Sequence, residues 1–232
     1  ISYKYCMRFS LFKIGGFSMN QELFEKRNAL YGPTVVKALE KRGFEAYYCA
    51  DKPAALEKAI SLIPKNHSVG WGGSASINEI GLVARLREDG YTLIDRDLGK
   101  TPEEKAELMR KVLTSDTFIT GTNALTEDGM LLNVDGTGNR LAAILYGPKS
   151  VVVIAGMNKI VRDIDAAKDR IRTTAAPINA TRFPGLRTPC ALTGKCGECL
   201  GDGCICAQWL VTRVCNPKGR IKVLIVGEEL GF

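Results

Sequence analysis

The chain has one histidine, no long apolar run and neither of the common nucleotide-binding motifs, and each absence removes a class of function. A Ser-His-Asp triad could use only His67, which lies in a lysine–asparagine turn and has the context of a solvated residue. The longest apolar runs, such as residues 151–155, are far short of the roughly 20 residues that cross a bilayer. The P-loop ending Gly-Lys-Ser/Thr and the fingerprint G-x-G-x-x-G are both missing. We therefore expect no membrane span and no P-loop or Rossmann nucleotide site.

An excess of positive charge is also missing from most of the chain. The formal charge is +7, but Lys4, Arg8 and Lys13 contribute +3 of it within the acid-free residues 1–18. The remaining basic residues are mostly spaced among Asp and Glu, as on an ordinary solvated surface. This pattern predicts no nucleic-acid partner. A composition of 45% apolar and 25% charged residues excludes intrinsic disorder and a coiled-coil rod.

The first 18 residues differ from the rest in their pattern. Met19 reads like a natural start that enters a helix, so we expect 1–18 to be a poorly ordered extension and 19–232 to be one domain. Lys13 interrupts the only apolar stretch of the extension, and no small-residue cleavage site follows, which argues against a secretory signal. The expected location is the cytoplasm, where thiols stay reduced.

Strand-like and helix-like segments alternate from residue 20 onward. This alternation predicts the α/β class, with a mainly parallel sheet flanked by helices. The expected strands are 44–49, 68–71, 91–94, 117–120, 151–155 and 221–226, with a short ribbon over 130–134. The expected helices are 21–42, 53–62, 76–89, 102–113, 138–146, 158–171 and 207–214.

A glycine-rich bend joins the strand at 68–71 to the next helix and is the first candidate site. Glycines allow backbone N–H groups to approach an anion closely, and the following helix start adds partial positive charge. The same residues could form only a tight strand-to-helix turn. The candidate anion-binding residues are Gly70, Gly72, Gly73 and Ser74.

A polar stretch follows the strand at 117–120, at the expected carboxyl end of the sheet, where open α/β sheets place ligands. Glu127 and Asp128 are adjacent acids that could supply a catalytic base whose pKa is raised by its neighbour. Arg140, next to Asn139, could hold a carboxylate through two hydrogen bonds. An Asp-Gly hairpin turn and a surface arginine would explain the same residues.

Six of the eight cysteines lie between Cys190 and Cys215, and most of them fall in a Gly- and Cys-rich insert over 184–206. In a cytoplasmic chain this density favours a metal site over disulfides. Thiolates suit both tetrahedral zinc and iron–sulfur clusters, and the spacing does not choose between them. Redox-active or simply reduced cysteines are the third interpretation.

Together these stretches resemble the LUD-domain family, the lactate-utilisation proteins, in its single-domain form with a cysteine-bearing C-terminal part. The resemblance covers nearly everything from about residue 20. It is carried by 70–74, 122–129, Asn139-Arg140, Gly147-Pro148, Gly156-x-Asn158-Lys159-Ile160-Val161, Pro177-x-Asn179-Ala180-x-Arg182, 190–206 and the terminal 227–232.

The resemblance implies a fold like that of the sugar-phosphate isomerase and CoA-transferase superfamily. It also implies a role near lactate oxidation to pyruvate, beside iron–sulfur subunits. It places the metal-ligating thiols at positions matching Cys190, Cys196, Cys199 and Cys206. The additional Cys204 leaves the fourth ligand open between Cys204 and Cys206.

The function expected from the residues and the resemblance together is binding of a small anionic metabolite of organic-acid metabolism. Asn123, Asn139, Arg140 and Lys159 would hold it beside the glycine bend, and Glu127 or Asp128 would move a proton. One alternative is a non-catalytic partner subunit of an iron–sulfur oxidoreductase. Another is an isomerase or acyl-transfer enzyme of the wider superfamily. A homo-oligomer fits any of these, and the sequence leaves open whether the protein is an enzyme.

Overall fold

A computed structural model describes residues 19–232, so the expected extension over 1–18 lies outside the described residues. The centre of the molecule is a six-stranded sheet in which every neighbouring pair is parallel. Its strands, in spatial order, are β1 (Glu45–Cys49), β10 (Ile221–Val226), β7 (Ser150–Gly156), β4 (Thr117–Gly121), β2 (Ser68–Trp71) and β3 (Thr92–Ile94). The predicted α/β class with a mainly parallel sheet is confirmed.

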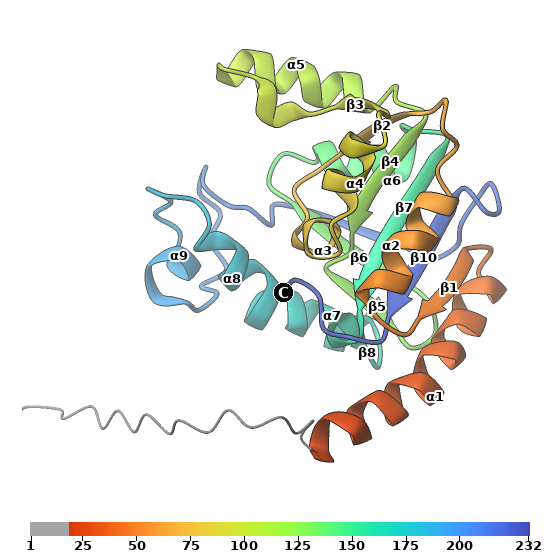
Figure 1. The fold of residues 1–232 in the computed structure, drawn as a ribbon. Helices are drawn as coiled ribbons and strands as arrows, with labels where there is room; N and C mark the ends of the chain where they lie inside the picture. The colour runs from red at the N-terminus through yellow and green to blue at the C-terminus, as the bar shows by residue number, and fades with distance from the viewer. Residues whose placement is uncertain (1–18) are drawn as a thin grey trace, which may run out of the picture.

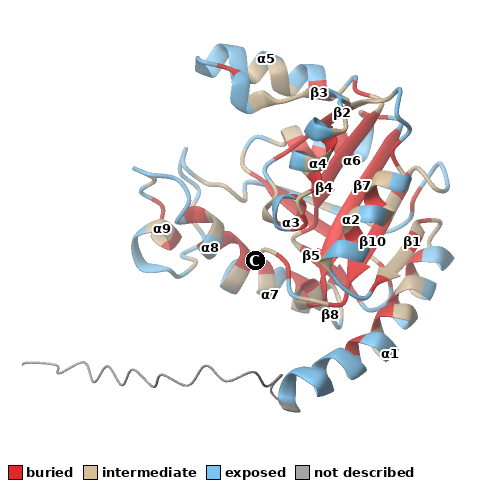
Figure 2. Ribbon diagram, in the orientation of Figure 1, coloured by how far each residue is buried: buried red, intermediate tan, exposed pale blue. Residues whose placement is uncertain are grey.

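The central strands are buried on both faces, which explains their continuous apolar sequence. Every residue of β7 and β4 is buried, and Figure 2 shows these strands as the core of the molecule. β-branched residues dominate β7, where Val151, Val152 and Val153 alternate between the two faces.

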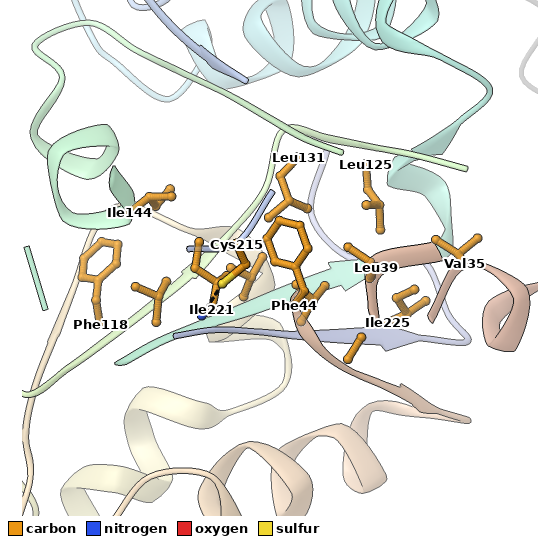
Figure 3. Close-up of a cluster of buried hydrophobic side chains, with 14 of the residues drawn as sticks. Val35, Leu39, Phe44, Phe118, Leu125, Leu131, Ile144, Cys215, Ile221 and Ile225 are labelled. Carbon is orange, nitrogen blue, oxygen red and sulfur yellow. Dashed lines mark hydrogen bonds between the residues drawn. The ribbon is translucent and has the colours of Figure 1, made fainter. Parts of the chain in front are cut away.

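Helices cover both faces of this sheet (Figure 1). On one face, α2 (Lys52–Ser61), α3 (Ala75–Glu79) and α4 (Leu82–Glu88) pack on the sheet through buried residues such as Ile77 and Leu86. The other face carries α1 (Met19–Lys41), α5 (Pro102–Val112) and α6 (Asn139–Leu145). Figure 3 shows Val35 and Leu39 of α1 packed there with Phe44 and Ile225. None of the helices in residues 19–232 is long and apolar enough to span a membrane.

A second, four-stranded sheet packs beside α1 and carries one wall of the candidate site. Its strands, in spatial order, are β8 (Ile160–Val161), β5 (Ala124–Thr126), β6 (Leu131–Asp135) and β9 (Gln208–Thr212). Leu125 and Leu131 face the core shared with the first sheet, as Figure 3 shows. Leu132 and Val134 face the opposite way, toward α7 (Ile164–Arg170).

Three predicted helices differ from the structure. Residues 208–212 are a strand, because their Trp, Leu, Val and Thr complete the open edge of β6. The helix expected over 76–89 is divided into α3 and α4 by Gly81, whose φ is 75°. The segment expected as a helix over 158–171 begins with a 3₁₀ turn and β8, and α7 starts only after its N-cap, Asp163.

The remaining short elements flank the ends of the strands. They are the 3₁₀ turns η1 (Arg96–Leu98) and η2 (Met157–Lys159), a π-helical turn (Ile171–Ala175), α8 (Ala176–Ala180) and α9 (Pro189–Thr193). The cysteine-rich insert leaves α8, contains α9 and returns as β9, so it lies on one side of the molecule (Figure 1).

Candidate functional site

A cavity of about 390 Å³ lies where several strands of the parallel sheet end. The segments that follow β2, β4, β7 and β10 all contribute to its lining, as the rule for ligand sites in open α/β sheets expects. The second sheet, α8 and the cysteine-rich insert complete the wall. The lining includes Gly73, Ser74, Arg96, Gly121, Asn123, Asp135, Asn139, Arg140, Lys159, Asn179, Arg182, Ile205 and Phe232.

Of the glycine-rich bend, only Gly73 and Ser74 line the cavity. The other two predicted glycines act through packing: a Cβ at Gly70 would lie 2.8 Å from a methyl group of Val112, and one at Gly72 would lie 3.2 Å from the Arg140 chain. A Cβ at Gly73 would lie 3.0 Å from Arg96 Nη2. The bend therefore needs glycine so that two arginines can approach its backbone. Since α3 has five residues, the partial charge at its start is small.

Arg140 is buried at the cavity wall, and all five of its N–H groups have acceptors within the protein. Nε donates to Asp135 Oδ1 at 3.0 Å, and the Nη atoms donate to the side chains of Asn133 and Asn123, both at 2.7 Å. The other two bonds go to the carbonyl oxygens of Val134 and Gly121. Arg140 thus ties the ends of β4 and β6 together and has no free donor for the carboxylate that the sequence assigned to it.

The two predicted asparagines also lie in the cavity wall. Asn123 Oδ1 accepts hydrogen bonds from Arg140 Nη2 and from the backbone N–H of Val134. Asn139 Oδ1 accepts from the hydroxyl of Thr137 at 3.0 Å. Of these two asparagines, Asn123 is thus the one that bonds to Arg140, whereas Asn139, at the start of α6, bonds to Thr137.

Lys159 is the last residue of η2, the 3₁₀ turn that follows β7, and is 5% exposed. Its Nζ donates to Ser76 Oγ at 2.8 Å. Burial, together with the positive charges of Arg170 and Arg140, lowers the pKa of Lys159 to about 7, although Glu79 acts in the opposite direction. A neutral amine is therefore well populated near neutral pH.

Arg96 and Arg182 line the cavity and were not predicted as site residues. Arg96 lies in η1, just past the end of β3, and contacts the Met109 sulfur and the exposed Asp97. Arg182 lies just past α8, and its guanidinium is 5.8 Å from the centre of the Phe232 ring. Two sequence signals could have identified these residues. Arg96 follows the end of a predicted strand, and Arg182 belongs to the motif Pro177-x-Asn179-Ala180-x-Arg182.

Glu127 and Asp128 lie at the tip of the β5–β6 hairpin, outside the lining of the cavity. Glu127 accepts a hydrogen bond from the Tyr31 hydroxyl at 2.6 Å, and Asp128 pairs with Arg42 at 2.5 Å, so both acids face α1. Four residues of extended chain separate Glu127 from Asn123, roughly 13 Å. The structure therefore does not bring these acids together with the other predicted site residues, and their catalytic role stays a prediction.

The cysteines of the insert are close together without forming a ligand set. Cys204 Sγ lies 3.8 Å from Cys206 Sγ, about the edge length of a zinc tetrahedron with Zn–S bonds of about 2.3 Å. Burial and the neighbouring thiols, Cys204 above all, raise the pKa of Cys206 to about 12 and also raise that of Cys199. No group of three or more Cys, His, Asp or Glu in residues 19–232 is placed to hold a metal ion. The pair thus fits two ligands, and the predicted set of four is not assembled.

Cys190 and Cys215, at the two ends of the predicted cysteine run, are buried. Cys215 belongs to the core of the main sheet, where its Sγ contacts the carbonyl oxygen of Pro217. Cys215 is therefore separate from the insert, and it was not among the predicted metal ligands. The insert still reaches the cavity, through Ile205.

The model of the LUD domain family matches residues 33–226. The chain therefore belongs to the LUD-domain family, as its sequence motifs indicated.

The fold of this chain is similar to that of several solved structures. A DUF162 family protein from Deinococcus radiodurans is 14% identical, with 86% of this chain and 97% of that chain covered and a TM-score of 0.49. The eIF2B delta subunit from Chaetomium thermophilum is 18% identical over 49% of each chain, with a TM-score of 0.34. A chain of the tetrameric eIF2B-beta2-delta2 complex from the same organism is 17% identical, covers 61% of this chain and 57% of its own, and has a TM-score of 0.34. No curated protein matches the chain.

Proposed function

We propose that this LUD-domain protein binds a small organic anion, of the size and charge of lactate or pyruvate, in the cavity at the ends of the parallel strands. The observation that carries the proposal is the charge of the lining: four basic residues, Arg96, Arg140, Lys159 and Arg182, against one acid, Asp135. That acid is paired with Arg140 at 3.0 Å, so the guanidinium groups of Arg96 and Arg182 give the cavity a net positive potential even where Lys159 is uncharged.

The roles within the cavity differ from those that the sequence indicated. Arg140 and Asp135 shape the wall. Asp135 accepts from Arg140 Nε and from two backbone N–H groups at the start of α6, and the Nη groups of Arg140 donate to the ends of the strands. Arg96 and Arg182 supply the guanidinium groups that would bind the anion, and Asn139 supplies an amide. A volume of about 390 Å³ lies in the range of small-molecule pockets.

The test is calorimetric titration of the full chain with lactate, pyruvate and inorganic phosphate. The variants Arg96→Met and Arg182→Met should each weaken binding of the preferred acid by roughly tenfold or more, since a charge-assisted hydrogen bond contributes about 1.5–3 kcal/mol. Arg110→Met is the matched control, because it removes the same charge from an exposed position of α5, where Arg110 pairs with Glu107. Binding that is equal in all three variants, or absent in the parent protein, would contradict the proposal.

A further inference from the structure

Lys159 is a buried amine without a carboxylate partner among the residues that the structure describes. In residues 19–232 no carboxylate oxygen lies within ion-pair distance of its Nζ, and its hydrogen bond goes to the neutral hydroxyl of Ser76. Glu79 is the acid that acts on it electrostatically, and its Oε2 already accepts a hydrogen bond from the backbone N–H of Gly231 at 3.0 Å. A buried ammonium without an ion pair is costly, so this environment favours the uncharged amine.

The surroundings of Lys159 limit the access of water to this amine. A Cβ at Gly231 would lie 3.4 Å from Lys159 Nζ, which places the backbone of the tail 230–232 directly over the amine. Asn158 holds that tail, because its Oδ1 accepts from the backbone N–H of Leu230 at 3.1 Å. Phe232 then forms part of the cavity lining. The amine thus lies in the wall of the cavity, under a cover formed by the end of the described chain.

A buried, uncharged lysine amine beside an anion-binding cavity has the chemistry of a nucleophile toward carbonyl carbon. No ion pair within residues 19–232 accounts for Lys159, whose hydrogen bond goes to a neutral hydroxyl. Arg96 and Arg182 line the same cavity and can hold the anionic end of a small molecule.

We propose that Lys159 forms an imine with the carbonyl carbon of a small anionic carbonyl compound, of the 2-oxo acid class, bound in this cavity. The inference rests on the proposed function, since the anion must first bind. The nitrogen lone pair attacks the carbonyl carbon, and the C=O electron pair moves to oxygen, which takes a proton. The nitrogen then releases its two protons. One replaces the proton that the oxygen took up, and the other joins the hydroxyl group, which leaves as water. A C=N bond remains, and no oxidant or reductant takes part.

The test is reductive trapping on the full chain. The protein is incubated with pyruvate and then with sodium borohydride, and its intact mass and peptides are measured. We expect one adduct per chain at Lys159, with a mass increase equal to that of the acid less one oxygen atom. Lactate is the matched ligand control, because it has the same charge and nearly the same size but no carbonyl group, and it should give no adduct.

Two variants locate the reaction. Lys159→Arg should lose the adduct, whereas Lys168→Arg, which changes an exposed lysine of α7 that pairs with Asp165, should keep it. Far-UV circular dichroism shows whether each variant is folded. If Lys159→Arg does not fold, the peptide map of the parent protein still decides, because an adduct spread over exposed lysines would overturn the inference.

The pH dependence gives a second readout. The groups around the amine are Ser76 and Glu79 of α3, Arg140 of α6 and Arg170 of α7, and the two arginines stay charged throughout. The trapping rate should therefore rise with a midpoint near pH 7, well below that of an exposed lysine. Calorimetric binding of pyruvate without any adduct at Lys159 would overturn the imine and leave the anion-binding function intact. Absence of binding by both acids would instead contradict the function itself.

Discussion

Single residues decide what this site can do, and Arg140 illustrates how partners fix the role of a residue. The sequence shows an arginine after a polar loop, which is compatible with carboxylate binding. In the structure its five N–H groups are used by Asp135, Asn123, Asn133 and two carbonyl oxygens. Those acceptors come from the ends of two strands in different sheets, and their convergence depends on tertiary structure. The role of Arg140 therefore could not be derived from local sequence.

Lys159 gives a prediction about stability and pH. Its pKa is lowered from 10.5 to about 7 by burial and by the charges of Arg170 and Arg140, against the opposing effect of Glu79. Between those two values the unfolded chain binds a proton that the folded chain does not, so the free energy of unfolding should increase as the pH rises. The gain is on the order of a few kcal/mol, because one pKa unit corresponds to about 1.4 kcal/mol.

The measurement is urea unfolding of the parent protein and of Lys159→Met at several pH values between 7 and 10.5. The difference between the two proteins cancels the contributions of other titrating groups, and it should grow in favour of the parent protein as the pH rises. A difference that does not change with pH would show that Lys159 keeps its proton throughout this range.

Among the elements, the β5–β6 hairpin carries Glu127 and Asp128, whose catalytic role remains a prediction. Its tip is held against α1 by the Tyr31–Glu127 hydrogen bond and the Arg42–Asp128 ion pair. The Arg42 guanidinium also donates to the carbonyl oxygens of Asp128 and Arg213, so it joins α1 to two segments distant in sequence. This tip therefore has a structural role that is visible only after folding.

We predict that Glu127→Gln leaves the affinity for the organic anion within about twofold of the parent value, since Glu127 lies outside the cavity lining. Its free energy of unfolding should fall by less than about 1 kcal/mol, because the glutamine amide oxygen still accepts from the Tyr31 hydroxyl but without the negative charge. Tyr31→Phe removes the bond and should lose about 0.5–1 kcal/mol, and the double variant should lose little more, because the two changes affect the same bond. Loss of anion binding or of imine trapping in Glu127→Gln would contradict this prediction and show that Glu127 acts in the site.

The elements that the sequence predicted correctly are those with one strong signal. β7 is a continuous apolar run. A threonine cap followed by proline predicts α5, and in the structure Thr101 is the N-cap and Pro102 the first helical residue. The helix expected over 207–214 is wrong, because the five residues of β9 are too few to show a period of two. Its Trp209 and Val211 pair with Val134 and Leu132 of β6, a partner about 75 residues away in the sequence. Only the unfilled edge of the second sheet makes this segment a strand.

At the scale of the whole molecule, the location of the site was more predictable than its composition. The rule that ligands bind at the carboxyl ends of parallel strands leads us to group the glycine bend, Asn123 and Lys159. The structure places Gly73 and Ser74 of the bend, with Asn123 and Lys159, in the lining of one cavity. Arg96 of η1 and Arg182 after α8 line the same cavity although they are 86 residues apart in the sequence, and this proximity arises only from the tertiary structure. The cysteine-rich insert reaches the same cavity through Ile205, and a Cβ at Gly136 would lie 3.2 Å from the Cys204 carbonyl oxygen.

Ile205 lies between Cys204 and Cys206, so its place in the cavity wall connects these thiols to the proposed anion site. This connection leads to a prediction about the whole molecule. The sequence predicts a thiolate-bound zinc ion or iron–sulfur cluster, and in residues 19–232 the cysteines supply one pair at ligand spacing but no group of three. A metal ion would therefore have to draw Cys190, Cys196 or Cys199 toward Cys204 and Cys206, and the insert would move with them. We expect zinc, titrated into reduced protein, to bind at one ion per chain and to change the affinity for the anion, because Ile205 lies in the cavity wall.

Three variants separate the ligands by competition with a chromophoric chelator. Cys204→Ser and Cys206→Ser test which thiol is the fourth ligand, and the variant that loses more affinity identifies it. Cys215→Ala is the control, because that thiol is buried in the core of the main sheet and should not affect the metal. If neither zinc nor anaerobic reconstitution with iron and sulfide loads the parent protein, the insert has no metal role. The 204–206 segment would then have a packing role alone, because its Cys204 carbonyl oxygen lies close to Gly136 in the cavity wall.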